Sequence, residues 1–117
     1  MTKILVIEDA DTLRNDVIEM LAFEGYTVLG AENGLTGVDK AISELPDLII
    51  CDIMMPELDG YGVLERLRAD LRTSTIPFIF MTARTERGDI RAGMTQGADD
   101  YLTKPFNSDE LISTIRT

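Results

Sequence analysis

The chain has 117 residues, a length that fits one domain of common size. Its formal net charge of −10 disfavours direct binding to a nucleic-acid backbone and favours a cation or a basic surface on a partner protein. The chain has no histidine, which excludes Ser-His-Asp and Cys-His catalytic sites and zinc sites built on imidazole. Its one cysteine, Cys51, excludes an internal disulfide and a cysteine metal cluster.

The sequence carries no sign of a membrane segment or a leader. No apolar run approaches the roughly 20 residues that a membrane-spanning helix needs. Met1, Thr2 and Lys3 lead directly into a strand-like run, without the features of a signal peptide. The cysteine content does not call for an oxidising compartment. We therefore expect a cytoplasmic protein without membrane association.

Short apolar runs alternate with segments of helical spacing along the chain. The runs are rich in Ile and Val, which is typical of strands covered on both faces, as in a parallel sheet. The segments between them place apolar residues three or four positions apart, which is typical of amphipathic helices. In chain order, the runs and the helical stripes are Ile4–Ile7; Leu13, Val17, Met20 and Leu21; Tyr26–Ala31; Leu35, Val38 and Ile42; Leu48–Cys51; Val63, Leu64 and Leu67; Phe78–Met81; Ile90 and Met94; Tyr101–Thr103; and Leu111, Ile112 and Ile115.

This alternation predicts five βα units. Such an order indicates a doubly wound α/β fold, with a five-stranded parallel sheet, right-handed crossovers and helices on both faces. Two helix starts carry capping signals. Asn33 is the expected N-cap of the second helix, and Asn107 with Glu110 resembles a capping box before the fifth.

The predicted domain covers residues 1–117, without a linker, a repeat or a low-complexity tract. Its last helix reaches Thr117 without a glycine stop or a polar tail. Two interpretations stay open. The helix is truncated here and continues into an output region of a longer parent protein, or a natural single-domain protein ends at this point.

Charged and hydroxyl side chains stand where the predicted strands end, the edge at which open α/β sheets place their functional sites. Glu8 and Asp9 follow the first strand, Asp52 the third, Thr82 ends the fourth and Lys104 the fifth. If the first and third strands are neighbours, three carboxylates crowd one place and raise one another's pKa unless a cation lies among them. An all-oxygen site of this kind suits Mg²⁺ or Mn²⁺.

The same residues match acyl-phosphate chemistry. A carboxylate is a weak nucleophile, but a metal ion can hold a phosphoryl donor in line with it and neutralise the developing charge. Lys104 and the Thr82 hydroxyl would complete a cradle for the phosphoryl oxygens. Because the chain has no histidine, the phosphoryl donor must come from elsewhere.

Over essentially its whole length, the chain resembles the receiver domain of two-component response regulators. The resemblance rests on Ile7-Glu8-Asp9, Asp52–Gly60, Met81-Thr82-Ala83 and Gly97–Phe106, in this order and at the predicted strand ends. It implies the flavodoxin-like receiver fold, with strand order 2-1-3-4-5. It also implies a phosphorylation switch rather than a turnover enzyme.

The resemblance implies a metal-binding and phosphorylation role for four residues. Asp52 resembles the phosphoacceptor, which also contacts the metal ion. Asp9 resembles the direct side-chain ligand, Glu8 the acidic partner acting through water, and Met54 the residue that lends a backbone carbonyl. Glu8 stands where aspartate is commoner in the family, but the longer carboxylate still reaches through water.

The resemblance also implies the switch and its partners. Thr82 resembles the switch hydroxyl, Lys104 the phosphate-binding lysine and Tyr101 the rotating aromatic. Lys104-Pro105 resembles the family's cis peptide. The implied donor is the phosphohistidine of a sensor histidine kinase or phosphotransfer protein. The implied output is a C-terminal domain or a partner. Homodimers through the fourth helix, fifth strand and fifth helix are common in the family.

Plainer interpretations exist for each residue alone. Glu8 and Asp9 could cap a helix, Asp52 could open a turn, and Thr82, Lys104 and Tyr101 could be ordinary core-edge, surface and packing residues. These plainer roles do not explain why all of these residues stand together at or beside the ends of the predicted strands.

Three competing functions are disfavoured. A haloacid-dehalogenase-type phosphatase keeps a D-x-D motif, whereas Ile53 and Met54 follow Asp52. A degenerate receiver that only binds partners usually lacks Asp52 or Lys104. A flavodoxin-like cofactor site needs a glycine-rich loop after the first strand, where Glu8 and Asp9 stand.

Overall fold

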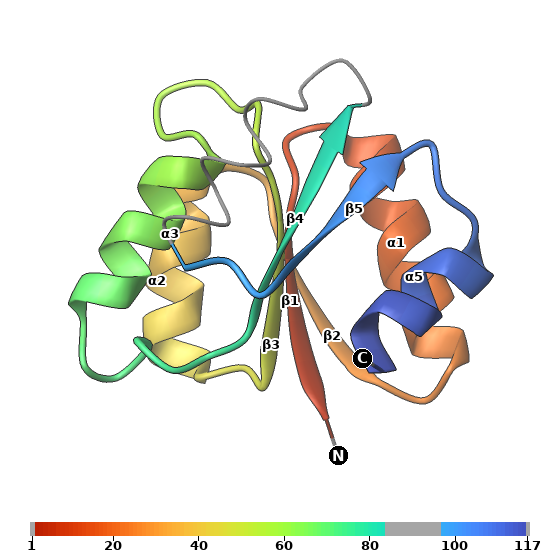
Figure 1. The fold of residues 1–117 in the computed structure, drawn as a ribbon, viewed down its shortest axis with the longest axis horizontal. Coiled ribbons are helices and arrows are strands. Elements are labelled where there is room, and N and C mark those ends of the chain that lie inside the picture. Colours follow the sequence, from red (N-terminus) through yellow and green to blue (C-terminus); the bar gives the residue numbers. More distant parts are fainter. Residues whose placement is uncertain (1, 84–96, 117) are drawn as a thin grey trace.

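The five predicted strands form one parallel sheet in the order β2-β1-β3-β4-β5 (Figure 1). The computed structural model describes residues 2–83 and 97–116. The strands are β1 (Lys3–Ile7), β2 (Thr27–Ala31), β3 (Leu48–Asp52), β4 (Phe78–Ala83) and β5 (Asp100–Lys104). The strand order and the doubly wound class are therefore confirmed, and each strand lies within two residues of its predicted bounds.

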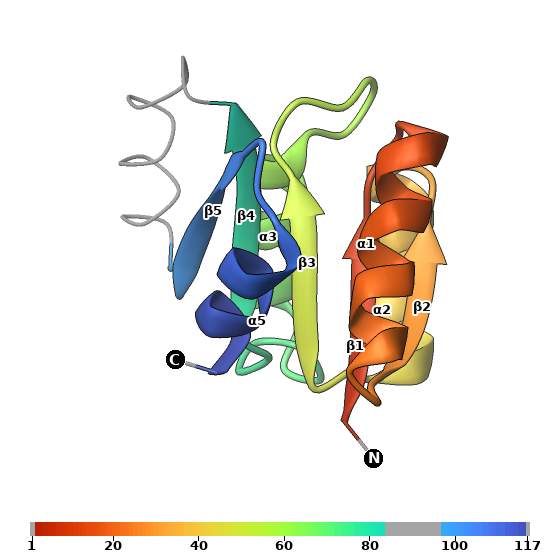
Figure 2. The ribbon, with the colours of Figure 1, turned by 90° about the vertical axis from the view of Figure 1, so that its right-hand side faces the viewer.

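Helices cover both faces of this sheet, as the alternating pattern predicts. Helices α1 (Asp11–Phe23) and α5 (Ser108–Arg116) lie on one face, and α2 (Gly34–Glu44) and α3 (Gly60–Ala69) on the other (Figures 1 and 2). The predicted fourth helix, with Ile90 and Met94, lies outside the described residues. Within the described ranges, no helix has the length and apolarity to cross a membrane.

The side chains of the central strand β1 alternate between two apolar cores. Leu5 and Ile7 pack with the cluster under α2 and α3, whereas Ile4 and Val6 pack with the cluster under α1 and α5. All four are fully buried. Complete burial of such a side chain contributes about 1.5–3 kcal/mol, so the two-residue period of the strand fixes β1 firmly between the layers. The residues that follow β1 are thereby held at a defined place.

Both predicted helix caps are confirmed. The Asn33 side chain accepts a hydrogen bond from the backbone N–H of Thr36 at 2.8 Å, at the start of α2. At the start of α5, the Asn107 side chain accepts from the Glu110 N–H at 2.8 Å, and the Glu110 carboxylate accepts from the Asn107 N–H at 3.3 Å. Caps of this kind are worth about 1 kcal/mol each and set where the helices begin.

Candidate functional site

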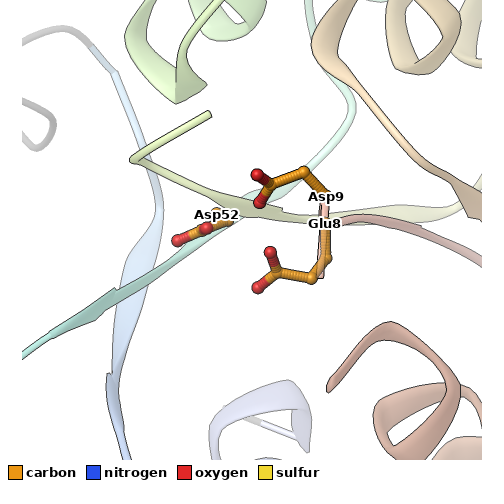
Figure 3. Close-up of side chains that lie close together, drawn as sticks. All are labelled: Glu8, Asp9 and Asp52. Carbon is orange, nitrogen blue, oxygen red and sulfur yellow. The ribbon is translucent and has the colours of Figure 1, made fainter. Parts of the chain in front are cut away.

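The register of the sheet brings the predicted acidic residues together. Ile7 of β1 pairs with Cys51 of β3, so the next residues of the two strands are Glu8 and Asp52. Each of Glu8, Asp9 and Asp52 offers a carboxylate oxygen that lies within 4.8 Å of the other two (Figure 3). Glu8 and Asp52 are buried, and Asp9 is exposed. The expectation that the first and third strands are neighbours is confirmed.

Lys104 joins this acidic cluster from the far side of β4. Its Nζ atom lies 3.0 Å from Oε1 of Glu8 and 3.1 Å from Oδ1 of Asp52. Burial lowers the pKa of Lys104, but its hydrogen bonds to Glu8 and Asp52 and their charges outweigh this, so the pKa is raised overall. The side chain is therefore an ammonium ion at neutral pH. The next peptide bond, Lys104-Pro105, is cis, as the resemblance implies.

The acidic pair after β1 does not form the N-cap of α1. The N-cap residue is Ala10, which has no side-chain acceptor. Oε2 of Glu8 instead accepts a hydrogen bond from the Ala10 N–H at 3.1 Å, while its other oxygen binds Lys104. Glu8 is thus held from both sides at the end of its strand, and the interpretation of the pair as the N-cap is wrong.

The cluster carries more negative charge than Lys104 can balance, since it has three carboxylates against one ammonium ion. A hydrogen bond with Glu8, burial and the negative charge of Glu8 together raise the pKa of Asp9. Oxygen ligands and excess negative charge are what Mg²⁺ requires. Two oxygens bound to one Mg²⁺ lie at most about 4.2 Å apart, so small side-chain movements would let these carboxylates share an ion.

The backbone of Asp52 is held by the start of α3. The Gly60 N–H donates a hydrogen bond to the Ile53 carbonyl at 2.8 Å. A Cβ atom on Gly60 would lie 2.5 Å from the carbonyl oxygen of Asp52, closer than real Cβ atoms approach. The N-cap residue Asp59 accepts from the Gly62 N–H at 2.9 Å and fixes where the helix begins. Glycine is required at position 60 because α3 approaches the strand end so closely.

Comparison with known proteins identifies the family. The family model of the response regulator receiver domain matches residues 4–116. This chain belongs to that family. PilH of Pseudomonas aeruginosa is 42% identical to this receiver domain over 98% of the chain, which spans 95% of PilH. RpaA of Synechocystis sp., a DNA-binding dual master transcriptional regulator, is 41% identical over 99% of the chain, which spans only 48% of RpaA.

A solved structure supports the same assignment. The receiver domain of a sensor histidine kinase from Pseudomonas aeruginosa matches 98% of this chain, which matches 94% of that one, with a TM-score of 0.90 and 32% identity. That crystal structure holds a magnesium ion coordinated in the active site cleft. Receiver domains bind Mg²⁺ at an acidic pocket, and in this receiver domain Glu8, Asp9 and Asp52 form an acidic cluster.

The remaining predicted site residues of this receiver domain lie on β4, on β5 and in the loop after β3. Thr82 is buried, one position beyond the Met81 that pairs with Asp52, and its hydroxyl donates to the Ala83 carbonyl at 3.3 Å. Tyr101 lies on β5 and is 42% exposed. Met54, in the loop after β3, is 62% exposed. Their roles in the switch and in metal binding stay predictions.

Cys51 lies in the apolar core next to the acceptor strand end. It is fully buried, and burial, followed by the charges of the neighbouring carboxylates, raises the pKa of its thiol well above the ordinary value. The thiol is therefore protonated and behaves as a small core side chain.

Sequence reasoning missed two features of the receiver site. It assigned Lys104 to phosphoryl oxygens, whereas the ammonium group also pairs with Glu8. It named Gly60 only as the end of the Asp52–Gly60 motif, whereas the structure requires glycine there because a Cβ atom would clash with the Asp52 backbone. No sequence signal reveals the first feature. For the second, a glycine inside a helical pattern is a weak signal of close packing.

Proposed function

We propose that this receiver domain is a phosphorylation switch whose acceptor is Asp52. The donor is the phosphohistidine of a sensor histidine kinase or a phosphotransfer protein. One observation carries the proposal: the Lys104 ammonium group lies 3.1 Å from Asp52 and 3.0 Å from Glu8, inside an acidic cluster at the carboxyl ends of the strands. A carboxylate flanked by an ammonium ion and a metal site is suited to acyl-phosphate formation.

The metal ion we propose is Mg²⁺, with Mn²⁺ as a substitute. Asp9 and Asp52 would bind it directly, the carbonyl of Met54 would add a backbone oxygen, and Glu8 would act through water. The donor set is all oxygen, which suits these hard cations. When bound, the ion supplies Lewis-acid neutralisation of charge on the phosphoryl oxygens. The magnesium ion in the related sensor-kinase receiver supports this choice.

The transfer step uses a carboxylate oxygen of Asp52. This oxygen attacks the phosphorus atom in line with the P–N bond of the phosphohistidine. The O–P bond forms as the P–N bond breaks, and the electron pair of that bond stays on the imidazole nitrogen, so no oxidant or further reactant is needed. Lys104, already hydrogen-bonded to Asp52, stabilises the charge that develops on the phosphoryl oxygens.

Phosphorylation adds a charge of about −2 at the end of β3. We propose that the Thr82 hydroxyl and Lys104 turn toward this new anion, and that Tyr101, 42% exposed on β5, moves into the space that Thr82 vacates. The surface formed by β5 and α5 then changes its affinity for an output domain or a partner protein. A homodimer through this surface is also proposed, but its fourth helix lies outside the described residues.

The output itself is not specified by this chain. It spans about half the length of RpaA but nearly all of PilH, so long and short proteins both occur among the relatives. We propose that the domain acts in the cytoplasm, does not bind nucleic acid directly, and takes up one phosphoryl group instead of turning over a substrate. The domain limits of 1–117 remain part of the proposal.

The test is phosphorylation by a small donor. The protein is incubated with an acyl phosphate and Mg²⁺, and intact mass spectrometry measures the number of phosphoryl groups added. We expect one group on the wild type and on Asp59→Asn, a matched control at the start of α3 whose side chain still caps that helix. We expect none on Asp52→Asn.

Two results would overturn the proposed switch. The first is the absence of an adduct on the wild type, and the second is an equal adduct on Asp52→Asn. Hydrolysis of a phosphate ester beyond one equivalent would instead favour a phosphatase of the haloacid-dehalogenase type.

A further inference from the structure

The turn between β1 and α1, residues 8–10, carries two of the three clustered carboxylates and is tied to the first turn of α1 by one side chain. Nη1 of Arg14 donates a hydrogen bond to the backbone carbonyl of Glu8 at 2.8 Å. Nη2 of the same guanidinium donates to Oδ1 of Asp11 at 2.6 Å. The Arg14 side chain is only 16% exposed, so these bonds form in a partly dehydrated place where they are strong.

The neighbouring edge strand leaves room for this arginine. A Cβ atom on Gly30 of β2 would lie 2.9 Å from Cδ1 of Ile18 and 3.4 Å from Cδ of Arg14. The next residue of β2, Ala31, accepts a hydrogen bond from the Glu8 N–H at 3.0 Å. Strand β2 therefore binds the N–H of Glu8 and leaves room for Arg14, which binds the carbonyl of Glu8.

We propose that Arg14 is a positioning residue for the metal site, a role that rests on the proposed function. The Glu8 backbone is held at its N–H by Ala31 and at its carbonyl by Arg14. Asp9, the next residue, is exposed, so the direction of its carboxylate depends on the backbone that precedes it. Releasing the Glu8 carbonyl would let the turn sample other conformations and lower the affinity for Mg²⁺.

The positive charge of Arg14 affects Mg²⁺ affinity in the direction opposite to its positioning role, so the two effects can be told apart. A positive charge beside a cation site weakens cation binding, so removal of a guanidinium that acted only through its charge would strengthen it. Asp11 is 79% exposed, and solvent screens its charge, so the pair with Arg14 contributes little to the site. If Arg14 acts by positioning, its loss raises the Kd for Mg²⁺. If Arg14 acts only through its charge, its loss lowers that Kd.

The chain offers a matched control in Arg68, near the end of α3. Its guanidinium donates to the carbonyls of Ile76 at 2.7 Å and Gly97 at 3.1 Å, and it pairs with Asp99 at 3.3 Å. Arg68 is 22% exposed, similar to Arg14, and none of these partners belongs to the acidic cluster. Its removal breaks the same kinds of bond without touching the proposed metal site.

The experiment is calorimetric titration of the folded protein with Mg²⁺, together with the melting temperature in chelator. We expect Arg14→Met to raise the Kd for Mg²⁺ about tenfold, the lower end of what the loss of an outer partner costs. Arg14→Lys keeps the charge but not the planar fork, and we expect the same direction. Asp11→Asn and Arg68→Met should leave the Kd within about twofold of the wild type.

The outcomes separate the two proposals. An unchanged or lower Kd in Arg14→Met, or an equal rise in Arg68→Met, would overturn the positioning role, because a merely structural arginine lowers the melting temperature and leaves the Kd alone. Should the wild type itself not bind Mg²⁺, the proposed function fails and this inference fails with it. If Arg14→Met does not fold, Arg14→Lys decides the result by the same criteria.

Discussion

The Nζ atom of Lys104 lies 3.1 Å from Oδ1 of Asp52, although 52 residues separate the two in the sequence. The same ammonium group contacts Glu8, whose side chain is 1% exposed. A buried carboxylate keeps its charge only when a cation or hydrogen-bond donors compensate for the lost water. Lys104 is therefore both a part of the proposed reaction site and a counter-charge that stabilises the fold.

The first prediction concerns the loss of this counter-charge. In Lys104→Met, Glu8 and Asp52 keep their burial but lose their shared ammonium partner. Breaking a fully buried ion pair costs 3–5 kcal/mol, and because Lys104 is 26% exposed we expect about 2 kcal/mol here. The free energy of unfolding, measured by urea denaturation in chelator at neutral pH, checks this value.

Lys3→Met is the matched control for that experiment. Lys3 also pairs with a glutamate, Glu44, at 3.4 Å, but the two side chains are 34% and 46% exposed. Exposed pairs contribute little, so we expect a loss of at most about 0.5 kcal/mol. If Lys104→Met and Lys3→Met lost the same free energy of unfolding, Lys104 would be an ordinary surface charge.

The second prediction concerns Mg²⁺ and stability. An ion that binds only the folded state raises the free energy of unfolding by about 2.7 kcal/mol at a concentration of 100 times its Kd. We therefore expect Mg²⁺ to raise the melting temperature, and Asp9→Asn to remove most of that rise because it loses a direct ligand. Differential scanning calorimetry with and without Mg²⁺ measures both effects. Asp11→Asn, an acidic residue outside the cluster, should respond like the wild type; a full response in Asp9→Asn would speak against this ligand set.

The third prediction concerns pH in chelated protein. The pKa of Asp9 is raised above 3.8 in the folded state, first by its hydrogen bond with Glu8 and then by burial. Between 3.8 and that raised pKa, the folded state binds more protons than the unfolded state, so stability falls as pH rises through this range. Asp9→Asn should therefore be more stable than the wild type near about pH 7, and this gain should vanish as the pH falls below the range.

Asp70 provides a control of opposite sign. Hydrogen bonds from Arg72 lower the pKa of Asp70 from 3.8 to about 2, so its contribution to stability is present above 3.8 and is lost as pH falls toward 2. Asp70→Asn should be less stable than the wild type at neutral pH, and the deficit should disappear in acid. Urea unfolding across the pH range would contradict the argument if both variants shifted stability in the same direction.

Sequence patterns predicted the parts of this molecule that depend on period and order. The alternation of Ile4–Ile7 between two cores follows from the two-residue period of a strand, and the caps at Asn33 and Asn107 follow from local hydrogen bonding. The gathering of Glu8, Asp9 and Asp52 followed from their place at the ends of neighbouring parallel strands.

Contacts between distant side chains and backbones could not be predicted in this way. Arg14 reads as one polar residue on an amphipathic helix, and only the fold shows that its guanidinium reaches the Glu8 carbonyl. Lys104 contacts Glu8 because β3 and β4, which lie between β1 and β5, set the distance that its side chain must span. Such contacts depend on the three-dimensional approach of elements, which no period or motif in a single sequence encodes.

The fourth prediction concerns that kind of approach, at Gly60. A Cβ atom in Gly60→Ala would lie 2.5 Å from the Asp52 carbonyl oxygen and 2.8 Å from Cα of Ile53, both backbone atoms that cannot move aside cheaply. Overpacking of this kind costs 1–3 kcal/mol, so we expect about 2 kcal/mol of lost stability. Since Asp52 itself must shift, the yield of phosphorylated protein from an acyl phosphate and Mg²⁺ should fall several-fold, as measured by intact mass.

Gly62→Ala is the matched control, because it also replaces a helical glycine but does not place a Cβ atom against the Asp52 backbone. Its Cβ atom would meet Cδ1 of Leu58, the end of a flexible side chain, and alanine is favoured over glycine inside a helix by up to about 1 kcal/mol. We expect this variant to keep its stability within about 1 kcal/mol and its full phosphorylation yield. If Gly60→Ala were phosphorylated as fully as Gly62→Ala, the start of α3 would not hold Asp52 in place, and the position of the acceptor would depend on β3 alone.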